Sequence, residues 1–366
     1  MRIQFLIFPV ILLLAVIYIY YRIWHLLPVS HLSKWLITIA LLLPVALFFG
    51  YMSYRSESST YWFNQIVSIV GTSWMIILLY LLMTFLVIDI ARLFIPAIRP
   101  WFVNNLYGTV GVTTFILVTF IGGNLWYHHK VRVPLNIQID KPLNPIKVIG
   151  ISDLHLGYTI GKKELSGWVN MINAEKPDLI LIAGDIIDSN VVPVEQEKMF
   201  EELSSLSATY GVYACLGNHD YYADNEKSES FIKRAGINLL KDESVLVNDA
   251  FYVVGRDDRT NDVNRKSVAE LTKDLDHSKP ILLIDHQPYH LERVEAAGVD
   301  FQLSGHTHRG QVFPFNLVTD MVYEKSWGYL QKGNTHIYVS SGIGLWGGKF
   351  RIGTQSEYLV LQLNGK

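Results

Sequence analysis

Apolar and polar residues follow different patterns in the two parts of the chain. Residues 1–130 contain four charge-free stretches, each close to the ~20 residues of helix that a bilayer crossing needs. These stretches are Ile3–Tyr21, Trp35–Met52, Ile66–Ile88 and Tyr107–Trp126. Several of their ends carry tryptophan or tyrosine, which prefer the headgroup layer of a membrane. The pattern therefore predicts four transmembrane helices within residues 1–130.

Four spans would place both ends of this region on the same side of the membrane. The basic residues that flank the spans number four on each side: Arg2, Arg55, Lys130 and Arg132 on one, and Arg22, Lys34, Arg92 and Arg99 on the other. Cytoplasmic loops normally carry the excess of lysine and arginine, so equal counts favour neither orientation. We expect a multi-pass protein of the cell membrane. The sequence does not decide on which side of the membrane its C-terminal domain lies.

The segment 131–145, VRVPLNIQIDKPLNP, separates the apolar region from the rest of the chain. It contains three prolines, which disfavour helix and interrupt a sheet. We therefore predict an extended linker over residues 131–145, between a four-helix region (1–130) and a second domain (146–366).

From residue 146 onward, short apolar runs rich in β-branched residues alternate with amphipathic stretches. The runs that predict strands are 146–152, 178–184, 211–217, 250–255, 280–285, 300–305 and 336–341. The stretches 162–175, 195–208 and 263–275 predict helices between them. Nearly continuous apolar strands indicate a sheet that is covered on both faces. The alternation predicts a layered α/β domain.

Composition and charge agree with this division. Half of all residues are hydrophobic, which is typical of a chain with membrane spans. Residues 1–139 hold eight basic and two acidic residues, whereas residues 140–366 hold 23 basic and 31 acidic ones. No nucleic-acid binding is expected. The single cysteine, Cys215, excludes an internal disulfide framework and a cysteine-rich zinc site.

Polar clusters follow five of the predicted strands. They are Asp153-Leu154-His155, Gly184-Asp185, Gly217-Asn218-His219-Asp220, Asp285-His286 and Gly305-His306-Thr307-His308. Their imidazole and carboxylate groups suit Mn, Fe or Zn. Seven candidate ligands exceed the four of one tetrahedral zinc, so we predict two divalent metal ions. Two such ions can stabilise both the attacking and the leaving oxygen of a phosphoryl displacement.

The order D-x-H, GD, GNHD, H and GHxH resembles the signature of the calcineurin-like metallophosphoesterases. The segments DHQP, SGHTHRGQ and SSGIG are similar to the bacterial membrane-associated branch related to UDP-2,3-diacylglucosamine pyrophosphatases. The resemblance covers residues 146–363 and implies a two-sheet β-sandwich flanked by helices. It also implies a hydrolase that cleaves phosphoester or pyrophosphate bonds.

The resemblance assigns roles motif by motif. It implies a first metal held by Asp153, His155 and His308, a bridging Asp185, and a second metal held by Asn218, His286 and His306. His219 would protonate the leaving oxygen, and Asp220 would orient His219 through a hydrogen bond. Arg309 departs from the family pattern, because a glycine is common at its position. Arg351 is a candidate for binding substrate phosphate.

Three functions are compatible with these features. The leading one is a membrane-anchored phosphoesterase for a lipid-linked phosphate or a nucleotide–lipid pyrophosphate, because the anchor holds the site near the bilayer. Trp346, in the glycine-rich segment GIGLWGG, would then contact the lipid. The second is a phosphodiesterase or phosphatase for a soluble nucleotide or phosphoprotein, with the spans as a tether. The third is an inactive membrane sensor or scaffold. The sequence favours no particular oligomeric state.

Overall fold

The structure is a computed structural model that describes residues 4–53, 60–261 and 263–366. The chain forms two compact units. The helical unit comprises residues 1–125 and 347–349, and the α/β unit comprises residues 126–346 and 350–366.

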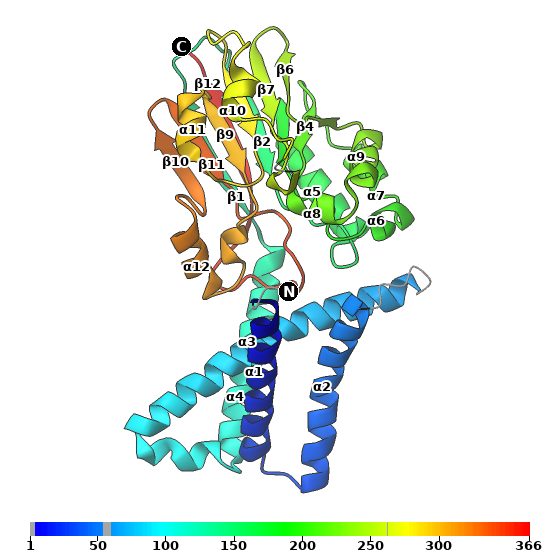
Figure 1. Cartoon of the computed structure of the whole chain (residues 1–366), viewed down its shortest axis with the longest axis vertical. Helices are drawn as coiled ribbons and strands as arrows, with labels where there is room; N and C mark the ends of the chain where they lie inside the picture. Colours follow the sequence, from blue (N-terminus) through cyan, green and yellow to red (C-terminus); the bar gives the residue numbers. More distant parts are fainter. Residues whose placement is uncertain (1–3, 54–59, 262) are drawn as a thin grey trace. The chain divides into compact units, whose positions relative to one another are not determined.

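Long apolar helices make up the helical unit (Figure 1). They are α1 (Gln4–Leu26), α2 (His31–Ser53), α3 (Tyr61–Phe94) and α4 (Leu106–His128), with a short 3-10 helix η1 (Pro96–Phe102) before α4. Stretches in α2, α3 and α4 are long and apolar enough to cross a membrane, whereas the apolar stretch Val10–Leu26 of α1 is shorter. Three of the four predicted spans therefore have the length and apolarity of a membrane helix. Ile3, the predicted start of the first span, lies outside the described residues.

Asp89 is an acidic residue near the end of a predicted span, and its charge is compensated within the helical unit. Its carboxylate lies 3.1 Å from Nη2 of Arg22 and 2.9 Å from Nη1 of Arg92. Tyr18 donates a hydrogen bond of 2.7 Å to the same carboxylate. Compensation of this kind lowers the cost of a charge in an apolar surrounding.

Two six-stranded sheets form the α/β unit. The first sheet has the order β1 (Lys130–Gln138), β12 (Ser356–Asn364), β2 (Ile146–Ile151), β3 (Leu179–Ala183), β4 (Val212–Cys215) and β5 (Asn238–Leu239). The second has the order β10 (Gly328–Lys332), β11 (Thr335–Val339), β9 (Phe301–Ser304), β8 (Ile281–Ile284), β7 (Phe251–Gly255) and β6 (Glu243–Val247). Each predicted strand corresponds to one of these strands.

Helices of the α/β unit connect the strands and cover the outer faces of the sheets (Figure 1). They are α5 (Lys162–Ala174), α6 (Val192–Gln196), α7 (Met199–Leu203), α8 (Asn218–Tyr222), α9 (Asn225–Arg234), α10 (Val268–Thr272), α11 (Leu291–Ala296) and α12 (Phe315–Val322), with 3-10 turns η2 (Arg259–Asn261) and η3 (His308–Gly310). The predicted two-sheet architecture flanked by helices is confirmed.

Strand β3 shows how the layers are held together. All five of its residues are buried. Leu179 and Leu181 pack in the core between the sheets with Leu282 of β8. Ile180 and Ile182 point to the opposite face and pack in a second core with residues of α5. Because successive side chains alternate between faces, a strand covered on both sides is apolar throughout.

The predicted linker is wrong over most of its length. Residues 130–138 form β1, which pairs in parallel with β12 along all nine residues, from Lys130 opposite Ser356 to Gln138 opposite Asn364. β1 lies at the edge of its sheet. A proline such as Pro134 is tolerated in an edge strand because one side of that strand needs no ladder hydrogen bonds. The α/β unit therefore begins close to the end of α4, before the predicted boundary.

Candidate metal centre

The polar clusters converge because most of the strands that carry them run in parallel. Strands β2, β3 and β4 are parallel neighbours, and so are β7, β8 and β9. The predicted ligands follow the carboxyl ends of these strands: Asp153 and His155 after β2, Asp185 after β3, Asn218 after β4, His286 after β8, and His306 and His308 after β9. The fold thus places the ends of two sheets around one site.

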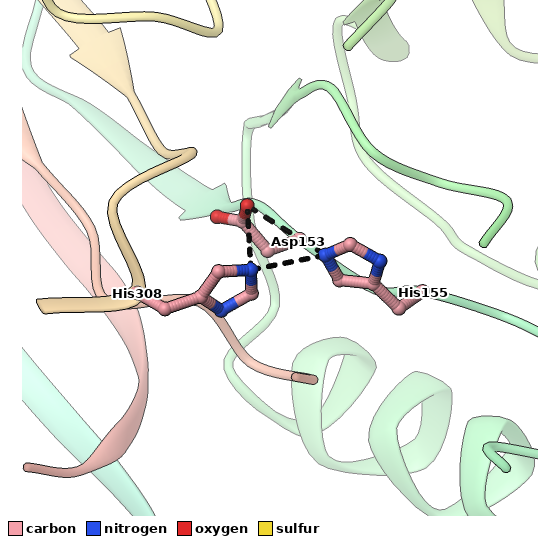
Figure 2. Close-up of side chains that lie close together, drawn as sticks. All are labelled: Asp153, His155 and His308. Atoms are coloured by element: carbon pink, nitrogen blue, oxygen red, sulfur yellow. Dashed lines mark hydrogen bonds and ion pairs between the residues drawn. The ribbon is translucent and has the colours of Figure 1, made fainter. Parts of the chain in front are cut away.

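Asp153, His155 and His308 form the first group of candidate ligands (Figure 2). The Nε2 atoms of His155 and His308 lie 3.0 Å apart. Nε2 of His308 lies 3.4 Å from Oδ1 of Asp153, and Nε2 of His155 lies 4.0 Å from the same oxygen. Figure 2 shows the three donor groups turned toward one another. Three such atoms around one point are the arrangement that a cation requires.

Asp185, His286 and His306 form a second group. Oδ2 of Asp185 lies 3.2 Å from Nε2 of His286 and 3.6 Å from Nε2 of His155, which belongs to the first group. Asn218 joins the second group, because its Oδ1 lies 2.8 Å from Nδ1 of His306. The Asp185 carboxylate thus lies between the two groups, as the predicted bridging role requires.

His308 of the first group and His306 of the second are held as neutral imidazoles, the form that binds a metal ion. Nδ1 of His286 lies 2.8 Å from the carbonyl oxygen of Ala183, and its Nε2 faces Asp185; burial opposes protonation of His286, but the charges of Asp185 and Asp153 raise its pKa well above the ordinary value. Burial, together with the charge of His286, lowers the pKa of His306 to about 4. Burial and the neighbouring His155 also lower the pKa of His308. This donor set fits two transition-metal ions.

Backbone strain is concentrated at the candidate ligands. Five of them have positive φ angles: Asp153 (55°), His155 (47°), Asp185 (52°), His306 (70°) and His308 (47°). Non-glycine residues rarely adopt this region, and such outliers tend to cluster at functional sites. The neighbouring glycines provide the space that the ligands need. A Cβ atom on Gly217 would lie 2.2 Å from Oδ1 of Asp185, and one on Gly305 would lie 2.3 Å from Oδ2 of Asp153.

Asp188, a residue that the sequence analysis missed, contacts His219. Oδ1 of Asp188 lies 3.1 Å from Nδ1 of His219 and 3.4 Å from Nδ1 of His155. Burial opposes protonation of His219, but the Asp188 contact and the charge of Asp185 raise the pKa of His219 above its ordinary value. The position of Asp188, three residues after Asp185 in one loop, is the sequence signal that could have identified it.

The predicted hydrogen bond between Asp220 and His219 is therefore wrong, because Asp188 contacts His219 instead. Asp220 is fully buried, and its carboxylate accepts hydrogen bonds from the backbone N–H groups of Gly217 (2.9 Å), Ile186 (3.3 Å) and Ile187 (2.8 Å). Asp220 thus ties the β3 loop to the start of α8. Burial and the charge of Asp185 raise the pKa of Asp220 to about 6.

The predicted role of Arg351 in binding phosphate is also wrong. Only 1% of Arg351 is exposed. Its guanidinium donates hydrogen bonds to the carbonyl oxygens of His308, Ser341, Gly342 and Gly344 and to Oγ of Ser356. Arg351 therefore fastens the C-terminal loops beneath His308 and has no group directed toward a substrate.

Two exposed aromatic side chains, Tyr222 and Trp346, lie near His219. The ring of Tyr222 lies 5.4 Å from the His219 ring, and the ring of Trp346 lies 6.4 Å from it. Tyr222 is 60% exposed and Trp346 is 51% exposed. Arg309, which stands where the family commonly has a glycine, makes a contact that glycine could not make: its guanidinium stacks on the ring of Trp327 at 3.9 Å.

Comparisons with known proteins agree with this geometry. Residues 146–310 match the family described as calcineurin-like phosphoesterase. An uncharacterized metallophosphoesterase of Helicobacter pylori is 33% identical over 236 residues, which cover 62% of each chain. A transmembrane protein with metallophosphoesterase domain from Danio rerio is 31% identical over 242 residues, covering 62% of this chain and 55% of that one.

A third relative, the phosphodiesterase YaeI of Escherichia coli, is 29% identical over 232 residues, covering 60% of this chain and 82% of that one. The matches to the Helicobacter and Danio proteins cover less than two thirds of those relatives. The strand-end motifs, the two ligand groups around Asp185 and the family match coincide. Residues 146–310 of the α/β unit therefore form a calcineurin-like metallophosphoesterase domain.

Proposed function

We propose that this chain is a membrane-anchored, dinuclear metal-dependent phosphoesterase that hydrolyses phosphoester or pyrophosphate bonds. The observation that carries the proposal is the position of Asp185, whose Oδ2 lies within 3.6 Å of a histidine nitrogen in each ligand group. When bound, two divalent cations would supply Lewis-acid activation of water and of phosphoryl oxygens. Manganese, iron and zinc all suit the donor set.

The protein's own residues supply positioning and proton transfer. Asp153, His155, Asp185, Asn218, His286, His306 and His308 would hold the cations. His219 would donate a proton from Nε2 to the leaving oxygen, while Asp188 accepts the hydrogen bond from Nδ1. Asp188 thereby fixes both the tautomer and the orientation of the ring. The raised pKa of His219 keeps it protonated at a higher pH, as a general acid requires.

A lipid-linked substrate is the one that we favour. The apolar helices hold the domain at a bilayer, and Trp346 and Tyr222 expose aromatic surface beside the proposed acid His219. A phosphate ester or pyrophosphate that carries an acyl chain could present its headgroup to His219 and its apolar part to these rings. The relative YaeI is named a phosphodiesterase, so we favour a phosphodiester over a phosphomonoester as the substrate of this chain.

A substrate panel with the full chain tests the proposal. The detergent-purified protein, loaded in turn with Mn²⁺, Fe²⁺ or Zn²⁺, is given nitrophenyl phosphate monoesters and diesters, a soluble nucleotide and a nucleotide–lipid pyrophosphate. We expect turnover of the diesters and the highest kcat/KM for the lipid pyrophosphate, with no turnover by Asp185→Asn. Preference for the soluble nucleotide would instead support an enzyme for soluble substrates whose apolar helices serve only as a membrane tether. No metal-dependent turnover of any ester would contradict the proposal and favour a sensor.

A further inference from the structure

Helix α12 exposes an apolar face. Its side chains Phe315, Leu317, Val318, Met321 and Val322, here named the α12 surface, are between 45% and 86% exposed. The helix contributes no buried residue to the α/β unit. The spacing 315, 318 and 322, with 317 and 321 beside it, places these side chains on one face of a helix. Contiguous exposed apolar residues of this kind mark a surface that contacts another protein or a membrane.

Polar residues on the opposite face attach α12 to the metal centre. Asp320 accepts a hydrogen bond from Oγ of Ser326, and the carbonyl oxygen of Ser326 accepts one of 2.6 Å from Oγ1 of Thr307. Thr307 lies between the candidate ligands His306 and His308. Gly310 packs so closely against the start of α12 that a Cβ atom there would lie 2.2 Å from the carbonyl carbon of Phe315. The apolar face therefore points away from the body of the unit.

The two ends of α12 lead directly to the site. The ring of Tyr323, the residue after α12, lies 6.2 Å from the ring of His306. Before α12, the side chain of Gln311 bonds the backbone of Trp346, donating to its carbonyl oxygen at 2.9 Å and accepting from its N–H at 3.3 Å. Trp346 in turn lies beside His219. Whatever covers the α12 surface is thus close to the metal centre.

The short connection between α4 and β1 indicates that a lipid bilayer covers the α12 surface. Helix α4, which is long and apolar enough to cross a membrane, ends at His128, and β1 begins at Lys130. A single residue, His129, separates the end of that helix from the first residue of the sheet. One residue reaches no more than ~3.6 Å. If α4 crosses a bilayer, the first strand of the domain therefore begins within a few ångströms of the end of that membrane helix.

We propose that the α12 surface docks into the headgroup and upper acyl region of this bilayer. Interfacial helices combine an apolar face with a polar face in this way, and they lie in the plane of the membrane. Docking would bring Trp346 and the neighbouring metal centre close to the lipid surface. The proposal concerns contact with lipid and does not depend on the proposed phosphoesterase activity.

Lipid contact at position 321 can be measured directly in the full chain. Met321→Cys is labelled with a polarity-sensitive fluorophore in nanodiscs of phosphatidylcholine and phosphatidylglycerol, each holding one protein molecule. The unsubstituted chain controls labelling, because its single thiol, Cys215, is buried. Val263→Cys is the matched control, since Val263 is an apolar residue of the same unit that is 96% exposed. Brominated acyl chains then serve as the quencher.

We expect a blue-shifted emission at position 321 and quenching by brominated lipid that is several-fold stronger than at position 263. Introducing Leu317→Asp beside the label should abolish most of this difference, whereas Leu317→Ile should preserve it. Equal quenching at 321 and 263 would overturn the proposal. So would a blue shift at 321 without lipid quenching, because that result indicates that the side chain is buried against protein and not against lipid.

Discussion

The Nδ1 atom of His219 lies 3.1 Å from Oδ1 of Asp188, and this carboxylate also lies 3.4 Å from Nδ1 of His155. One acidic side chain therefore orients both the proposed general acid and a candidate metal ligand. Burial opposes ionisation of Asp188, but the contacts with His155 and His219 hold its pKa well below the ordinary value. These contacts therefore favour the charged form of Asp188.

Replacing Asp188 should change the pH profile of the reaction. His219 acts as an acid, so activity is lost as the pH rises through its pKa. Asp188→Asn removes the charge that raises this pKa. We expect the alkaline limb of the kcat profile to move to lower pH, with kcat at pH 8 falling about 10- to 100-fold. A profile with an unmoved alkaline limb would assign Asp188 a purely structural role.

Asp220→Asn serves as the matched control for that variant. Its carboxylate accepts three backbone hydrogen bonds and makes none to His219. We expect a lower melting temperature, because an amide can satisfy fewer of the backbone donors. The pH profile of the remaining activity should keep its alkaline limb. A shift equal to that of Asp188→Asn would restore the original assignment of Asp220.

Replacing His219 should slow the hydrolysis of esters with poor leaving groups more than that of esters with good ones. His219→Asn should leave the metal content unchanged and slow turnover of an alkyl phosphodiester by about 10²–10⁴-fold, the usual contribution of a general acid. The loss should be much smaller for a nitrophenyl ester, because nitrophenolate leaves without a proton. Equal losses on the two substrates would remove His219 from proton transfer.

Asp185 should control metal content. Its carboxylate reaches both ligand groups, so Asp185→Asn should bind fewer than two metal ions and lose activity together with them. Elemental analysis of the metal-loaded full chain measures the stoichiometry. Asp300→Asn is a suitable control, since Asp300 is buried and paired with Lys141 at 2.6 Å but belongs to neither ligand group. Retention of two equivalents by Asp185→Asn would contradict the bridging role.

Arg351 should be needed for stability. Arg351→Met leaves the carbonyl oxygens of Ser341 and Gly344 without the donor they have in the described structure, each at a cost of about 1–3 kcal/mol. We expect a lower melting temperature and weaker metal retention, because the carbonyl oxygen of His308 also loses one of its two donors and keeps only the N–H of Gln311. Arg293→Met, at a side chain that is 68% exposed, should change stability by less than about 0.5 kcal/mol. Equal melting temperatures for the two variants would contradict this role.

The main elements of the fold were predictable because the sheets are covered on both faces. Strands such as β3 and β8 are apolar throughout and are followed by polar motifs, so the sequence predicts both their positions and the candidate ligands that the structure brings together. β1 was not predictable, because Pro134 disfavours a strand except at an edge, and edge position depends on pairing with β12. Sequence pattern describes local preference and leaves the partner of a strand open.

The errors at the site have a related cause. Asp188 and Asp220 both follow metal-ligand motifs closely in sequence, and only the path of the loops decides which of them reaches His219. Arg351 is a candidate for phosphate binding from its sequence because arginine commonly binds phosphate, whereas its four carbonyl partners come from two separate loops. The positive φ angles of ligands such as Asp153 likewise arise from tertiary packing.

Trp346 provides the sharpest test of the lipid substrate. Its ring is half exposed and lies 6.4 Å from the ring of His219, so it can contact the apolar part of a bound substrate while His219 contacts the leaving oxygen. Trp346→Ala should therefore lower kcat/KM for a nucleotide–lipid pyrophosphate about 10-fold or more, since burial of a large side chain contributes roughly 1.5–3 kcal/mol.

The same variant should barely affect a soluble nitrophenyl phosphodiester, because that substrate has no acyl chain to bury. Trp346→Phe should recover most of the activity on the lipid, since an aromatic ring remains beside His219. Parallel losses on both substrates would mean that Trp346 supports the fold of the loop. Unchanged rates on both would favour the tether reading, in which the apolar helices only hold the enzyme at the membrane.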